Sequence, residues 1–181
     1  MPPAFERHLS CVCFGALVVS IACVISGCHH RPDQAGFSDL SFRPAVAVVQ
    51  LRCAKIPGVS AIASHCWFAE FDRSAKRWRR WEVWQNAGKG PGSWGHIRRD
   101  LMGPANGVGH GDSWVLAEWT GAEADRLTAV LREPTRYPWP NTYRYWPGPN
   151  SNTYVAWVLR EAGVSAGLPW GAIGRWYCIF G

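Results

Sequence analysis

The chain has 181 residues, and its 19 Lys and Arg against 13 Asp and Glu give a net charge of +6. This length suits one domain with a hydrophobic core, and a composition of 48% hydrophobic and 18% charged residues excludes a disordered chain. No two runs are apolar enough to span a bilayer, which excludes a multi-helix transporter. Twelve Trp are several times the usual number, and all of them follow Cys28.

Residues 1–27 have the features of a lipoprotein-type signal peptide. The apolar run at 11–26 is long enough for a signal sequence and short for a membrane span. It ends in Ile25-Ser26-Gly27-Cys28, which resembles the lipobox of bacterial lipoproteins. This resemblance implies that Cys28 is lipidated and that the membrane is a partner through the lipid. His29 favours the outer membrane over the inner one, at the periplasmic face. The alternative is an uncleaved anchor helix.

Export changes what the seven cysteines can do. Three leave with the signal and Cys28 carries lipid, so that Cys53, Cys66 and Cys178 remain. These three allow at most one disulfide and leave one thiol over. An oxidising compartment permits the bridge. Cys53 and Cys66 could face each other across a hairpin, although the sequence does not fix the pairing.

A polar tether at 28–44 precedes a single globular domain at 45–181. Segments rich in β-branched and aromatic residues predict four strands, at 45–53, 64–72, 77–85 and 113–119. The Gly-rich stretch at 86–112 has the length of a functional lid or a disordered segment.

Two helices are predicted in the C-terminal part of the domain. Thr120, three residues before Glu123, predicts a capping box that opens the first helix, which ends before Pro134. A connector rich in Pro and aromatic residues leads to a second helix at about 150–162, which ends at Gly163. Strands followed by helices predict an α+β fold, an antiparallel sheet with the helices packed on one side.

Four consecutive polar residues stand where the second helix begins. Asn150, Ser151, Asn152 and Thr153 are all N-cap residue types, but one cap needs only one of them. The exposed N–H groups of a helix N-terminus favour an anion or a developing oxyanion. The segment therefore predicts a site that includes Ser151, and the alternative is that Asn150 or Ser151 merely caps the helix.

The strand at 64–72 carries a second candidate. A turn centred between Ser74 and Ala75 would place Trp67 opposite Glu82, so that His65 and Glu82 become diagonal neighbours on one face. A carboxylate that orients a His is what a general base needs. A register slip of one residue would move Glu82 to the other face. His65 would then be an ordinary core histidine.

A basic run, Lys76 to Arg80, is interleaved with Trp and could be interpreted as a nucleic-acid surface. The signal peptide argues against that partner, and anionic lipid headgroups or cell-wall polymers fit the compartment better. The alternative is a solvated strand edge. The His residues lack metal-ligand spacing, so that we expect neither a metal site nor a cofactor.

Several segments together resemble the bacterial family known only as domain of unknown function 3750. They span most of residues 45–178, and WPGPNSNT at 146–153 is the most specific of them. That family has no established activity.

The segment from Asn150 to Val155 is also similar to the Asn-Cys-x-x-Phe-Val signature of permuted papain-like hydrolases, such as lecithin retinol acyltransferase-like proteins and relatives of cell-wall amidases. In those hydrolases a strand bearing His precedes a helix opened by the nucleophilic Cys. The similarity implies a permuted papain-like fold with His65 as base and Ser151 at the nucleophile position. Ser151 departs from that pattern, which has Cys at this position. The departure matters because a Ser hydroxyl does not ionise at a helix N-terminus as a thiol does.

We expect an exported lipoprotein whose papain-like cleft binds a glycan, peptide or acyl group of the cell envelope without catalysis. The residues expected to bind are Asn150, Asn152, Thr153, Trp67, Trp146 and Trp157. The alternative is an amide or ester hydrolase or acyltransferase that uses Ser151 with His65 and Glu82.

Overall fold

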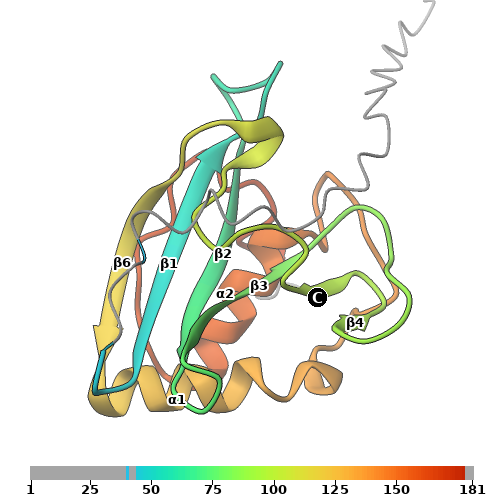
Figure 1. Cartoon of the computed structure of the whole chain (residues 1–181). Coiled ribbons are helices and arrows are strands. Elements are labelled where there is room, and N and C mark those ends of the chain that lie inside the picture. Colours follow the sequence, from blue (N-terminus) through green and yellow to red (C-terminus); the bar gives the residue numbers. More distant parts are fainter. Residues whose placement is uncertain (1–39, 41–43, 178–181) are drawn as a thin grey trace, which may run out of the picture.

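In residues 40 and 44–177, which the computed structural model describes, six strands form one antiparallel sheet and two α-helices cover one of its faces (Figure 1). The strands are β1 (Val48–Lys55), β2 (Ser64–Asp72), β3 (Arg77–Val83), β4 (Ser93–Trp94), β5 (Ile97–Arg99) and β6 (Trp114–Thr120). The helices are α1 (Gly121–Leu131) and α2 (Ser151–Ala162), with 3-10 turns η2 (Val108–His110) and η3 (Pro134–Arg136). The strand order is β4-β5-β3-β2-β1-β6, and the α+β prediction is confirmed.

The alternation of side chains along the strands divides the interior into two layers. Val49, Leu51 and Cys53 of β1 join Cys66 and Phe68 of β2 beneath the helices, in one large apolar core. The opposite face of β1 and β2 carries smaller apolar clusters and several buried polar side chains. Among the described residues, neither helix has the length and apolar content needed to cross a bilayer.

The Gly-rich stretch at 86–112 is partly structured, and the expectation of a continuous loop is wrong for its middle. Here β4 and β5 form a hairpin in which Trp94 pairs with Ile97, and Ile97 also pairs with Val83 of β3. Gly95 makes this tight turn with φ +62, and a Cβ there would lie 2.1 Å from the carbonyl oxygen of Pro140. Only glycine meets both conditions.

The capping box expected at Thr120 is wrong. Thr120 does stand at the N-cap of α1, but its side chain makes no capping hydrogen bond. Its backbone is extended and pairs with Val48 as the last residue of β6, and the N–H of Gly121 donates to Ala47 O. The chain passes directly from strand to helix through Gly121, whose φ is +57. The first backbone N–H of α1 is thus hydrogen-bonded to the main chain next to β1 and not to a capping side chain.

The hairpin between β1 and β2 contains a disulfide, whose pairing the sequence alone did not fix. Cys53 and Cys66 pair across the two strands and are bridged, with a sequence separation of 13. In the chain-entropy account, closing a loop of this size stabilises a fold by about 3 kcal/mol. The bridge lies next to the start of β2, where the candidate site begins.

Candidate functional site

The register of the hairpin between β2 and β3 is the one expected from its turn. Asp72 Oδ1 accepts hydrogen bonds from Ser74 N, Ser74 Oγ and Ala75 N, and these bonds shape the turn. Phe68 then pairs with Trp81, which puts His65 and Glu82 on one face of the sheet. His65 Nε2 lies 2.8 Å from Glu82 Oε2. The predicted pairing of His65 with Glu82 is present.

Both members of this pair are buried on the face opposite the helices. Glu82 has no exposed surface and His65 is 5% exposed. The His65 ring stacks on Trp67 at 5.7 Å between centroids and meets the ring of Trp84 edge-on at 5.3 Å. The pair is thus enclosed by aromatic side chains of its own two strands and of the residue that follows β3.

Arg80 completes the buried network, and sequence reasoning missed its role. Its Nη2 donates to Glu82 Oε2 at 2.8 Å, while its Nη1 donates to the carbonyl oxygens of Gly103 and Asn106. The guanidinium lies 3.9 Å above the ring of Trp67. The sequence grouped Arg80 with a solvated basic run. Arg80 lies two residues before Glu82 on the same strand. This spacing could have predicted that the two side chains share one face of the sheet.

The electrostatics of the network fix the protonation of the histidine. Burial raises the pKa of Glu82, but the charge of Arg80 and the hydrogen bond from His65 outweigh it, so that this pKa lies below its ordinary value. Burial also lowers the pKa of His65, against the opposing effect of Glu82. His65 is therefore neutral at pH 7. Since a carboxylate only accepts hydrogen bonds, the proton is on Nε2 and Nδ1 has the lone pair.

The polar residues at the start of α2 have separate structural tasks. Asn150 Oδ1 accepts from the N–H groups of Asn152 and Thr153, and Thr153 Oγ1 accepts from Asn150 N, which makes a capping box. Thr153 Oγ1 also donates to the carbonyl oxygen of Gly174 at 2.8 Å. Asn150 is therefore the N-cap of α2, which is one of the two roles that the sequence left open for it.

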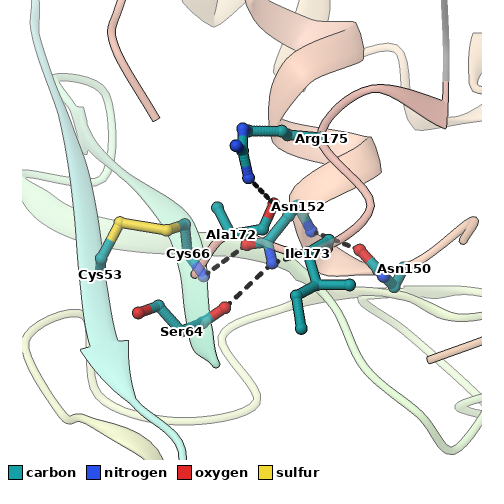
Figure 2. The surroundings of a disulfide bond; sticks show 8 residues. All are labelled: Cys53, Ser64, Cys66, Asn150, Asn152, Ala172, Ile173 and Arg175. Carbon is teal, nitrogen blue, oxygen red and sulfur yellow. Dashed lines mark hydrogen bonds between the residues drawn. A yellow bond between two sulfur atoms is a disulfide. The ribbon is translucent and has the colours of Figure 1, made fainter. Parts of the chain in front are cut away.

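Asn152 joins α2 to the start of β2 (Figure 2). Its Oδ1 accepts from Cys66 N at 3.2 Å, and its Nδ2 donates to Ser64 O at 2.9 Å and to Ile173 O at 3.0 Å. The two groups on β2 lie on either side of His65 and point the same way along the sheet. The side chain of Asn152 therefore bonds to β2 as a neighbouring strand would.

Ser151 is the remaining polar side chain of this turn. It is 5% exposed, and its hydroxyl makes no hydrogen bond within the described part of the chain. Among the same residues no hydrogen bond joins it to His65. The structure thus brings His65 and Glu82 into contact and sets the first turn of α2 against the strand that carries His65.

The aromatic residues expected to bind a ligand are not brought together. Trp67 is fully buried with Ala54 and Val108, whereas Trp157 lies in the core between the helices and the sheet. Trp67 Nε1 donates to the carbonyl oxygen of Pro104. Trp146 is 76% exposed. Of this set, Trp146 is thus available to a ligand without rearrangement.

Two further sequence expectations concern metals and lipidation. In residues 40 and 44–177, no group of three or more His, Cys, Asp or Glu side chains is arranged to hold a metal ion. Cys28, the expected lipidation site, and Cys178 lie outside the described residues.

A family model for proteins of unknown function, DUF3750, matches residues 46–177. The chain belongs to this family. No curated protein and no solved structure matches it. The family match covers the whole sheet and both helices, and it names no activity, so that function has to be argued from the site.

Substitutions at neighbouring positions should separate structure from chemistry in the first turn of α2. Asn152→Ala leaves three main-chain groups without their partner and should lower the free energy of unfolding by about 3 kcal/mol. Ser151→Ala removes an unbonded hydroxyl and should change it by less than about 1 kcal/mol. Urea denaturation of both variants measures this, and equal losses would contradict the division of tasks.

The lowered pKa of His65 predicts how stability depends on pH. Between the pKa in the folded protein and the ordinary value of 6.5, the unfolded chain binds more protons, so stability rises with pH. We expect the free energy of unfolding to fall as the pH drops below about 6.5, and the slope to flatten in His65→Gln, which retains a donor to Glu82. Urea denaturation across this range checks it. Identical slopes in the two proteins would refute a neutral, buried His65.

Proposed function

We propose that this protein is an amide or ester hydrolase, or an acyltransferase, in which Ser151 is the nucleophile, His65 the general base and Glu82 the group that orients it. The observation that carries the proposal is the buried hydrogen bond between His65 Nε2 and Glu82 Oε2. It leaves the lone pair on Nδ1, and a neutral imidazole with a fixed tautomer is the form that can accept a proton.

The allocation of polar groups around α2 supports Ser151 as nucleophile. Asn150, Asn152 and Thr153 are engaged in hydrogen bonds that hold the turn, whereas the Ser151 hydroxyl is not engaged. Ser151 is the first residue of a twelve-residue helix, and although the Asn150 cap occupies the N–H groups of Asn152 and Thr153, the positive end of the helix dipole favours a developing negative charge there. The order His65, Glu82, Ser151 also agrees with the permuted papain-like arrangement to which the sequence is similar.

The proposed reaction is an acyl transfer in two steps, through an acyl group bound to Ser151. Ser151 Oγ attacks the carbonyl carbon while its proton passes to His65 Nδ1, and the oxyanion faces the N-terminus of α2. When the carbon–nitrogen or carbon–oxygen bond breaks, the leaving amine or alcohol takes the proton from His65. Water, or an acceptor alcohol or amine, then releases the acyl group from Ser151. Within the described residues no hydrogen bond joins Ser151 to His65 and both are buried, so the proposed reaction requires the two groups to come into hydrogen-bonding distance when substrate binds.

Binding without catalysis is the second candidate function. It is favoured by Ser at the position where the similar hydrolases have Cys, and by the missing hydrogen bond between Ser151 and His65. The ligand would be a glycan, peptide or acyl group of the cell envelope. Burial of Trp67 and Trp157 weighs against the cleft first expected, so that Trp146 would have to contribute most of the apolar contact.

A fluorophosphonate probe, which labels activated serines, distinguishes the two functions. We expect the folded protein to be labelled, and the label to be lost in Ser151→Ala and strongly reduced in His65→Gln. Ser165→Ala, at an exposed serine of the loop after α2, is the matched control and should be labelled as the unmodified protein is. Failure of the folded protein to react would contradict catalysis and favour binding.

We also propose that the protein is an exported lipoprotein held at the periplasmic face, with the outer membrane favoured. The Cys28 lipobox supports lipidation, and the Cys53–Cys66 disulfide is typical of an oxidising compartment. A radiolabelled fatty acid fed to expressing cells should be incorporated into the protein and not into Cys28→Ala. Incorporation into both proteins, or into neither, would refute lipidation at Cys28.

A further inference from the structure

Four large aromatic side chains are exposed in the two segments that enclose the N-terminal end of α2. We name this set the aromatic platform: Tyr145, Trp146, Trp170 and Trp176. Their exposed fractions range from 58% to 76%, whereas Tyr137 and Tyr154, from the same part of the chain, are almost fully buried. Exposed aromatic side chains of this size, gathered in two adjoining segments, are typical of interaction surfaces.

The two segments are joined by several contacts. Asn150 Nδ2 donates to the carbonyl oxygen of Tyr145, and Thr153 Oγ1 donates to that of Gly174. A Cβ on Gly148 would lie 3.1 Å from the Cβ of Tyr177, so that the residues preceding α2 touch the last described residues. The platform is therefore carried by one folded unit and not by two separate loops.

The charged residues within the two segments that carry the platform, Arg144 and Arg175, are both basic. Arg144 is exposed beside Tyr145, and Arg175 donates to Trp170 O and lies 5.1 Å from the centroid of the Trp176 ring. From residue 134 to the end of the chain Glu161 is the sole acidic residue. Glu161 lies in the last turn of α2, about 15 Å along the helix from Ser151, and it pairs with Arg136 of η3. The platform is thus complementary to an anionic surface.

We infer that the aromatic platform docks on the surface of a lipid bilayer that carries anionic headgroups. Trp and Tyr prefer the membrane–water interface, where their rings are buried and their polar atoms stay hydrated, and neighbouring Arg attracts anionic lipid. A glycan would need polar side chains to read its hydroxyls, but Asn150, Asn152 and Thr153 are already engaged.

The chain that precedes the described domain favours the same occupant. It contains the apolar run at 11–26 and the lipobox Cys28. From residue 28 to residue 44 an extended chain spans at most about 55 Å, so a lipidated Cys28 would keep the domain close to a bilayer. At that distance even a weak surface contact is effectively intramolecular. The inference does not depend on the proposed catalysis.

Fluorescence quenching by brominated lipids tests the docking directly. The full chain is reconstituted in vesicles of phosphatidylethanolamine and phosphatidylglycerol, with or without bromine near the headgroup end of the acyl chains. We expect bromine to quench part of the Trp emission, and this quenching to be reduced in Trp146→Ser and in Trp176→Ser. Trp114→Ser is the matched control, because Trp114 is 36% exposed but lies on the edge strand β6.

The charge requirement is tested in the same vesicles. Replacing phosphatidylglycerol by phosphatidylcholine, or Arg144 by Glu, should reduce the quenching at low salt. Equal quenching in all Trp variants, or the same loss in Trp114→Ser, would overturn docking through the platform. Quenching that does not change with lipid charge would overturn the anionic specificity. Probe labelling of Ser151 does not enter these measurements, so either proposal can fail while the other stands.

Discussion

The contact on which the rest of this site depends is the side-chain amide of Asn152 bonded to the main chain of β2. Ser64 and Cys66 lie beyond the part of β2 that pairs with β3, which begins at Phe68. The carbonyl oxygen of Ser64 and the N–H of Cys66 are buried, and without a hydrogen-bond partner they would lower the stability of the fold. The carboxamide oxygen and one N–H of Asn152 supply the acceptor and the donor that a peptide group of a neighbouring strand would supply, and its second N–H bonds to Ile173 O. The bond therefore sets the height of α2 along β2, and with it the position of Ser151.

A second constraint comes from burying three ionisable groups on the opposite face of the sheet. Alone, Glu82 would take up a proton, because an isolated buried carboxylate is unstable. The Arg80 guanidinium keeps it charged, and the carbonyl oxygens of Gly103 and Asn106 satisfy the other side of Arg80. The segment that covers this face thus controls the charge of Glu82, and through it the tautomer of His65.

Local signals predicted the parts of this structure that depend on neighbouring residues. The Asp72 turn fixes the hairpin register by contacts within three residues, so the pairing of His65 with Glu82 followed from alternation alone. The start and end of α2 were predictable in the same way, from an N-cap Asn150 and Gly163 with φ +62. What could not be predicted depends on distant partners. Asn152 bonds to residues 86 and 88 positions away, and Arg80 to carbonyl groups beyond the next two strands. Thr120 misled because a local motif competed with strand pairing to Val48.

The two proposals constrain each other through the geometry of α2. The segments that carry the aromatic platform are those that contact the capping residues Asn150 and Thr153, so a platform docked on a bilayer would hold the N-terminal end of α2 close to that bilayer. Ser151 would then lie near the lipid surface instead of facing bulk solvent. Ser151, the proposed nucleophile, is only 5% exposed and would be poorly placed for a freely diffusing polymer. It would be better placed for an amphiphile that leaves the bilayer with its apolar part against the platform and its carbonyl toward the helix N-terminus. This combination favours acyl esters or amides of membrane lipids over cell-wall peptides as substrates of the proposed enzyme.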